Sequence, residues 1–149
     1  MIRLSKSCLS EKEKEAVKRV LDTEFLGMGP EVKAFEEKLE IFFERPVVCV
    51  VNGTAALHLS LQACGIGSGD EVIVPSLTYL ASFQAITACG AKPVACDIDN
   101  TNFCLNPDDI KELITTKTKA IMPVHYAGSP GNLDEIYKIA EIYNLRVIE

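Results

Sequence analysis

The sequence predicts an α/β fold, a three-layer α/β/α sandwich whose mostly parallel sheet carries helices on both faces. From residue 47 onward, short apolar runs rich in Val and Ile alternate with segments long enough to form helices. Parallel strands need crossover connections of that length. The apolar runs are continuous rather than alternating, which is typical of strands buried on both faces.

Two helices are predicted before the first strand. Ser10 and Glu13 form an S-x-x-E capping box that opens the first helix. The stretch Gly27–Pro30 then breaks the pattern, and Pro30 suits the first turn of a second helix with an apolar face. The run Val47–Val51 is rich in β-branched residues and predicts the first strand.

Alternating helices and strands are predicted for the rest of the chain. Gly65 and Gly90 end two of these helices, and Asn106-Pro107 followed by two acidic residues starts another. The helices are expected over residues 54–64, 78–89, from 106 onward and over 133–143, and the later strands over 71–75, 93–98, 120–124 and from Arg146 onward. The chain stops inside that last strand, at Glu149, where a domain does not normally end, so we expect a truncated chain.

Composition and charge exclude several classes of protein. The chain has 48% hydrophobic and 24% charged residues, as a globular protein does. Its net charge of −6 disfavours a general nucleic-acid binder, which needs clustered basic side chains. No apolar run approaches the ~20 residues that span a bilayer, and the first residues lack the apolar core of a signal peptide, so we expect a cytoplasmic protein.

The cysteines do not indicate a metal site. The six cysteines form no C-x-x-C pair, and the two histidines stand apart from each other. Cys49, Cys64 and Cys96 lie within apolar patterns and are expected to be buried thiols. We therefore predict neither a metal site nor a disulfide.

The turn between the first predicted strand and the next helix is the most specific candidate site. Gly53 allows close approach of another group to the backbone, and Thr54 and Ala55 begin a helix whose free N–H groups and dipole favour a phosphate. A plain strand–turn–helix with Thr54 as an ordinary N-cap fits the same stretch. These residues alone leave both interpretations open.

A second candidate is the stretch from Asp97 to Thr101. The pattern D-x-D-x-T after an apolar strand resembles the nucleophile loop of haloacid-dehalogenase-like phosphatases. The residues that follow do not continue that motif, and Asp-rich turns after strands are common. We regard this interpretation as the weaker one.

Several segments in order resemble one known family. The quoted segments are FLGMGPEVKAFEEKLEIFF, NGTAALHLSLQACGIGSGDEVIVPSLTYLASFQAI, GAKPVACDID and the closing RVIE. Together they resemble the DegT/DnrJ/EryC1/StrS sugar aminotransferases, whose large domain has the fold-type I architecture of pyridoxal-phosphate-dependent enzymes. Ordered matches over nearly the whole chain are far more specific than any single motif.

The resemblance implies roles for individual residues. It places Gly53, Thr54 and Ala55 at the phosphate of pyridoxal 5′-phosphate, and Tyr79 flat against the pyridine ring. A half-buried aromatic at a helix start is the alternative for Tyr79. Phe25–Gly29 and His125–Gly128 match family segments near the active site, without a firm contact for either; His125 could instead hold a loop.

The resemblance also implies what residues 1–149 lack. The family's acidic partner of the pyridine nitrogen directly follows V-I-E, and its Schiff-base lysine lies further on, so no catalytic residue is predicted in this chain. Residues 1–149 would comprise N-terminal helices and the first part of the cofactor-binding large domain, without its remainder and the C-terminal small domain. The partners of the strand at 47–51 would lie later in the protein, so we expect this segment, expressed alone, to be inactive and insoluble or molten.

For the complete protein the resemblance implies a cytoplasmic homodimer. It would move an amino group, usually from glutamate, onto a nucleotide-linked keto sugar for cell-surface polysaccharide or secondary-metabolite synthesis. It would have no nucleic-acid or membrane partner. Two alternatives stay open: a sugar dehydratase of the same family, and a non-catalytic fragment or binding module that keeps the scaffold.

Overall fold

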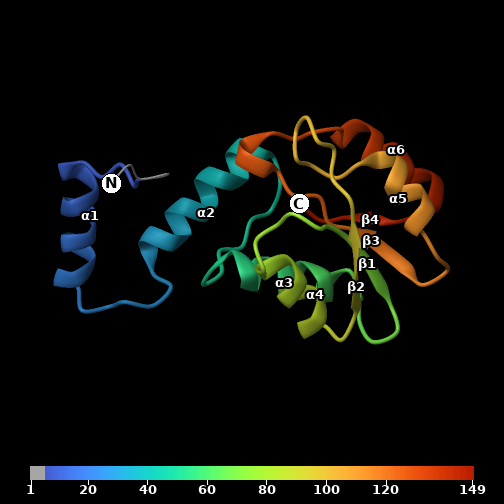
Figure 1. Ribbon diagram of the computed structural model, residues 1–149. Helices are drawn as coiled ribbons and strands as arrows, with labels where there is room; N and C mark the ends of the chain where they lie inside the picture. The colour runs from blue at the N-terminus through green and yellow to red at the C-terminus, as the bar shows by residue number, and fades with distance from the viewer. Residues whose placement is uncertain (1–5) are drawn as a thin grey trace. The chain divides into compact units, whose positions relative to one another are not determined.

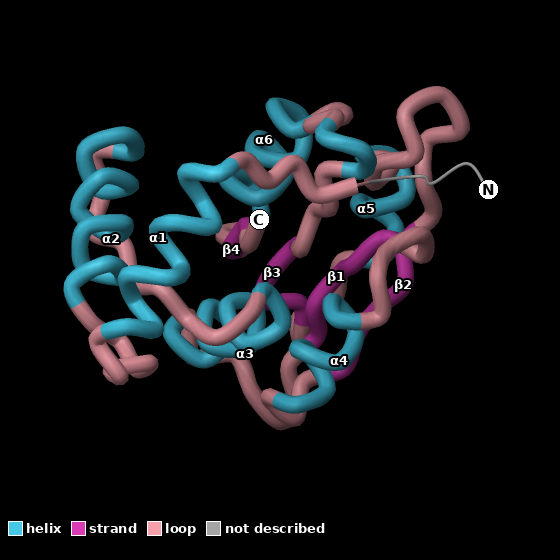
Figure 2. The backbone as a smooth tube through the Cα atoms, turned by 90° about the vertical axis from the view of Figure 1, so that its left-hand side faces the viewer, coloured by secondary structure: helices cyan, strands magenta, loops and turns pink. Residues whose placement is uncertain are grey.

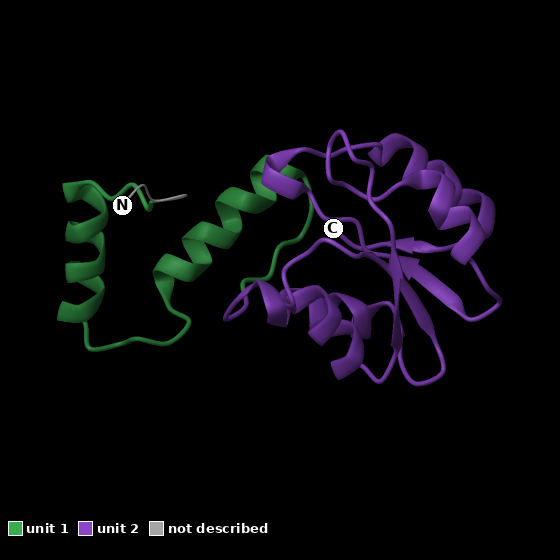
Figure 3. Ribbon diagram, viewed as in Figure 1, with its two compact units in different colours: residues 1–49 green, residues 50–149 purple. Residues whose placement is uncertain are grey.

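The computed structural model describes residues 6–149. The chain forms two compact units, residues 1–49 and residues 50–149, which Figure 3 shows in different colours. We call them unit 1 and unit 2 and describe each by itself.

Unit 1 contains the helices α1 (Glu11–Asp22) and α2 (Pro30–Phe43). The predicted capping box is confirmed. The Ser10 side chain accepts a hydrogen bond from the Glu13 backbone, and the Glu13 carboxylate accepts one from the Ser10 backbone N–H. Pro30 occupies the first turn of α2, also as predicted. Neither helix contains a buried residue.

The prediction of a first strand over Val47–Val51 is wrong. Residues 46–50 have no regular secondary structure, and within the described chain no strand pairs with them. The N–H groups of Val47 and Cys49 donate instead to the carboxylates of Glu40 and Glu36, at 3.1 and 2.7 Å. β-branched residues favour the strand conformation, but a strand also requires a neighbouring strand to which its backbone can hydrogen-bond.

Unit 2 is built on a parallel sheet. It has four strands, β1 (Glu71–Pro75), β2 (Lys92–Cys96), β3 (Thr118–Ile121) and β4 (Arg146–Val147), in the order β2-β1-β3-β4. All neighbouring pairs are parallel. The predicted parallel sheet is therefore confirmed.

Helices cover both faces of this sheet, as Figure 1 shows. On one face lie α3 (Gly53–Ala63) and α4 (Ala81–Ala88), which run side by side in the views of Figures 1 and 2. On the other lie α5 (Pro107–Leu113) and α6 (Leu133–Tyr143). Each face has its own apolar core, one around Leu61 and Ile86 and the other around Ile110 and Ile136, so the three-layer prediction is confirmed.

The predicted boundaries hold where the signal is local. β1 and α6 have the predicted bounds, and Asn106 caps α5 by accepting from the Asp108 N–H at 3.2 Å. Gly65 and Gly90 follow α3 and α4 with φ of +73° and +82°, a conformation that favours glycine.

The helix predicted from Thr78 begins later, at Ala81. The Ser76 N–H donates to the Cys96 carbonyl at 2.8 Å, so the chain still follows β2 when it leaves β1. Residues 76–80 form a turn rather than helix. Thr78 and Tyr79 consequently precede α4 instead of opening it.

The cysteine predictions are partly wrong. Cys96 is buried, and burial raises the pKa of its thiol to about 12. Cys49 is half-buried, whereas Cys64, which follows the last residue of α3, is exposed. Within residues 6–149 no helix is both long and apolar enough to cross a membrane.

Candidate functional site

A cavity of about 560 Å³ lies in unit 2 beside the carboxyl ends of β3 and β4. It is bordered by the start of α3, the turn before α4 and the segments that follow both strands. Its lining consists of Gly53, Thr54, Ala56, Leu57, Ser60, Thr78, Tyr79, Ala81, Ser82, Met122, Pro123, Val124, His125 and Glu149. Ligands of parallel α/β sheets usually bind at this edge.

Asn52, rather than Thr54, is the N-cap of α3. Its side-chain oxygen accepts from the Ala55 N–H at 2.9 Å, and its carbonyl accepts from the Ala56 N–H at 3.1 Å. The interpretation of Thr54 as an ordinary N-cap is therefore wrong. Sequence reasoning missed Asn52, although asparagine is among the preferred capping residues.

The first two amides of α3 are left as free donors. In the part of the chain that the structure describes, no protein oxygen accepts from the N–H of Gly53 or Thr54. The N-terminal end of a helix carries a partial positive charge, so these amides and the Thr54 hydroxyl suit an anion. The Ala55 amide differs, because Asn52 already occupies it.

Gly53 leaves open space beside the helix start. A Cβ added there would meet no atom of the described chain within 4 Å, and the residue is not among those with positive φ. Neither backbone conformation nor packing within this chain therefore requires glycine. The open space would admit close approach of an external group, so the residues present fit a phosphate.

Tyr79 presents an uncovered aromatic ring at the cavity. The residue is 83% exposed and lies in the turn before α4. The alternative of a half-buried aromatic at a helix start is therefore wrong. An exposed ring offers a large apolar face to a planar partner.

Two hydroxyl groups beside Tyr79 were not identified from the sequence. The Thr78 and Ser82 hydroxyls lie 2.9 Å apart, and Ser82 is buried. This contact joins the turn to the first turn of α4. It fixes the segment from which Tyr79 projects.

Two ionisable side chains, His125 and Glu149, border the cavity at the carboxyl ends of β3 and β4. His125 Nε2 lies 2.7 Å from Glu149 Oε2, and the Tyr137 hydroxyl donates to Glu149 Oε1. The hydrogen bond to this carboxylate raises the pKa of Tyr137. This contact joins the loop that carries His125 to the end of β4.

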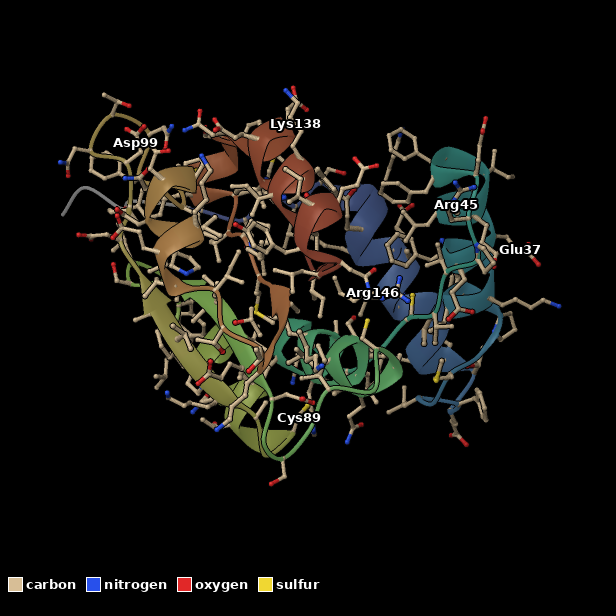
Figure 4. The ribbon with its side chains drawn as sticks, turned by 90° about the vertical axis from the view of Figure 1, so that its right-hand side faces the viewer. Glu37, Arg45, Cys89, Asp99, Lys138 and Arg146 are labelled. Carbon is tan, nitrogen blue, oxygen red and sulfur yellow. The ribbon has the colours of Figure 1, made fainter. Side chains whose placement is uncertain are left out.

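The Asp97–Thr101 stretch does not take part in this site. The Asp99 carboxylate accepts from the Thr101 backbone N–H at 2.7 Å and from its hydroxyl, and the Thr101 hydroxyl is the main cause that lowers the pKa of Asp99. Figure 4 shows Asp99 in the loop after β2, well separated from α3. Both contacts hold the Asp99 carboxylate in a local turn.

The remaining predicted segment, Phe25–Gly29, belongs to unit 1. It borders a hollow between the end of α1 and the start of α2. Among the described residues, no group of three or more His, Cys, Asp or Glu side chains is placed to hold a metal ion.

The fold and the helix start together define a class of protein. A parallel sheet between two helical layers, with a phosphate-type helix N-terminus at its carboxyl edge, is the architecture of fold-type I pyridoxal-phosphate enzymes. The profile of the DegT/DnrJ/EryC1/StrS aminotransferase family matches residues 7–149, and the chain belongs to that family.

Solved structures agree with this assignment. The aminotransferase TlmJ from Streptoalloteichus hindustanus is 35% identical with a TM-score of 0.91; the match covers 99% of this chain and 41% of that one. An aminotransferase from Psychrobacter cryohalolentis is 38% identical with a TM-score of 0.89, covering 95% and 37%. NtdA from Bacillus subtilis, solved with its cofactor PMP, is 38% identical with a TM-score of 0.88, covering 93% and 32%.

The chain thus spans only 32% to 41% of the length of these proteins. The family uses pyridoxal 5′-phosphate, of which PMP is the amine form. The free amides of Gly53 and Thr54 fit the phosphate of that cofactor.

Proposed function

We propose that the complete protein is a pyridoxal-phosphate-dependent sugar aminotransferase. The observation that carries this proposal is the start of α3, where free amides, a hydroxyl and open space at Gly53 converge on the cavity. Membership of an aminotransferase family supports the reaction class. Residues 1–149 would supply N-terminal helices and the first part of the cofactor-binding large domain.

In this proposal each site residue has a separate task. The Gly53 and Thr54 amides donate to the cofactor phosphate, the Thr54 hydroxyl adds a further donor, and Tyr79 covers one face of the ring. The Ala55 amide is not available to the phosphate in this arrangement, because it donates to Asn52, and Ala55 does not line the cavity. When bound, the cofactor would supply its pyridine ring as an electron sink for charge that develops at the substrate carbon.

The remaining parts of the proposal rest on the family. The acidic partner of the ring nitrogen and the Schiff-base lysine would lie beyond Glu149. The substrates would be a nucleotide-linked keto sugar and an amino-acid donor, glutamate in the usual case. The protein would act as a cytoplasmic homodimer in polysaccharide or secondary-metabolite sugar synthesis.

Titration of the complete apoprotein with pyridoxal 5′-phosphate tests the proposal. We expect a visible absorption band, and loss of that band when glutamate is added without a keto acceptor. Absence of any band would favour a binding module without chemistry. A band that glutamate does not discharge would contradict an aminotransferase that takes its amino group from glutamate.

Replacing Thr54 with alanine is expected to weaken cofactor binding about tenfold without unfolding the protein. A lost hydrogen bond to a charged group typically costs ~1.5–3 kcal/mol, and water at this open helix start replaces part of it. The measurement is the dissociation constant of pyridoxal 5′-phosphate from absorbance titration.

Two matched variants control this prediction. Thr54→Ser keeps the hydroxyl and should keep the affinity. Thr87→Ala removes an exposed hydroxyl that bonds to the α4 backbone, outside the cavity lining, and should have no effect on affinity. Equal affinity of Thr54→Ala and the parent protein would remove Thr54 from the site.

A further inference from the structure

One carboxylate links three separate segments beside the cavity. Glu149, which follows β4, accepts through Oε1 from the Tyr137 hydroxyl on α6. Its Oε2 lies 2.7 Å from His125 Nε2, on the segment that follows β3. We call these three side chains the Glu149 clasp. An ionised carboxylate only accepts hydrogen bonds, so the tautomer of His125 that fits carries its proton on Nε2.

The alternation of side chains places the clasp on the α5/α6 face of the sheet. Ile148 packs in the core beneath α3 and α4, whereas Val147 packs in the core beneath α5 and α6. Successive side chains of an extended chain point to opposite faces. Glu149 therefore lies on the side of α6, which agrees with its contact to Tyr137.

The clasp ties together two strand ends that form one wall of the cavity. The Ile148 N–H donates to the Ile121 carbonyl at 3.0 Å, so the sheet pairing continues to within one residue of Glu149. Met122–His125 and Glu149 all border the cavity. Any shift of the β4 end relative to the β3 end would therefore change the shape of that wall.

The clasp holds the ends of β3 and β4 in place, and it adds little to the overall stability of the protein. The side chains of His125 and Glu149 are 37% and 29% exposed, and ion pairs with such access to water add little to stability. Two donors from different segments nevertheless fix both oxygens of one carboxylate. Such a group restricts geometry even where its net energy is small.

We propose that Tyr137 and His125 are positioning residues, which act through Glu149 to hold the β3–β4 wall against the ring of the bound cofactor. The phosphate binds at the other wall, at the start of α3, so the two ends of the cofactor depend on different residues. This inference rests on the proposed function. It assigns a task to residues that the resemblance left without one.

The experiment compares two ligands on the complete apoprotein. Pyridoxal 5′-phosphate reports on both walls, whereas inorganic phosphate, used as its competitor, reports on the α3 wall alone. Tyr137→Phe should raise the dissociation constant of pyridoxal 5′-phosphate about three- to tenfold, through loss of one hydrogen bond to a charged group. The competition constant of inorganic phosphate should stay unchanged.

Tyr143→Phe is the matched control. Tyr143 ends the same helix, is 47% exposed like Tyr137, and would lose the same hydroxyl. It should leave both constants unchanged. Glu149→Leu should weaken the cofactor at least as much as Tyr137→Phe, and the double variant should add nothing to Glu149→Leu alone.

Each outcome decides the inference. If the parent binds pyridoxal 5′-phosphate and Tyr137→Phe binds it equally well, the clasp does not position the cofactor. If Tyr137→Phe weakens phosphate and cofactor alike, its role is general structural support and the inference is wrong. If the parent protein binds no pyridoxal 5′-phosphate, the proposed function itself fails, and the inference fails with it.

Discussion

Replacing Tyr79 with alanine in the complete protein is expected to weaken pyridoxal 5′-phosphate binding by several hundredfold. The ring is 83% exposed and borders the cavity, so in the proposed complex it would be covered by the cofactor alone on this side. Burying ~100 Å² of ring face at ~25 cal/mol per Å² contributes ~2.5 kcal/mol, and stacking adds ~0.5–1.5 kcal/mol. Absorbance titration of the apoprotein gives the affinity.

The companion variant Tyr79→Phe separates the two ways in which Tyr79 can act. It keeps the ring and removes only the hydroxyl, so we expect nearly the parent affinity. If Tyr79→Phe binds as weakly as Tyr79→Ala, the hydroxyl is the functional group and the stacking role is wrong. Thermal unfolding of the apoproteins should be alike for all three, because the side chain is exposed before the ligand binds.

Patterns that depend on neighbouring residues predicted much of the fold. The capping box at Ser10, the proline start of α5 and the glycine ends at Gly65 and Gly90 are each determined within a few residues. The strand Glu71–Pro75 has the predicted bounds because its centre, Val72–Val74, is an apolar run that a sheet covered on both faces buries completely.

Predictions failed where a distant partner decides the conformation. Val47–Val51 has the composition of a strand, yet its amides bond to α2 carboxylates because within the described residues no strand lies beside it. The helix α4 begins later than predicted. The Ser76 N–H, just after β1, donates a hydrogen bond to the Cys96 carbonyl at the end of β2, and this contact holds the start of the turn at residues 76–80. Neither contact has a signature in the local sequence.

The candidate site divides in the same way. Gly53 and Thr54 follow from a glycine and a helix start, which are local features. The Glu149 clasp joins residues whose proximity is set by packing of the sheet and α6, whereas the Thr78–Ser82 contact spans only four residues. Sequence reasoning identified His125 only by resemblance, and it gave no indication of Tyr137.

Residues 1–149 expressed alone are expected to be insoluble or molten. In unit 1 neither α1 nor α2 buries a residue, and Ile41 and Phe42 are 79% and 77% exposed. Val48 and Val51 are 78% and 86% exposed in a segment that no described strand pairs with. Apolar surface of this extent, next to a β-branched segment that lacks a neighbouring strand among the described residues, favours association.

The measurement is the thermal transition of the purified segment beside that of the complete protein, with binding of a hydrophobic dye as a second probe. We expect a broad transition and strong dye binding for the segment, as in molten states, and a sharp transition for the complete protein. Changing both Val48 and Val51 to lysine should reduce aggregation of the segment, because charges at an exposed strand-like edge oppose pairing. A soluble, monomeric segment with a sharp, cooperative transition would contradict the prediction, and it would show that the two cores of unit 2 suffice for folding despite the exposed surface of unit 1.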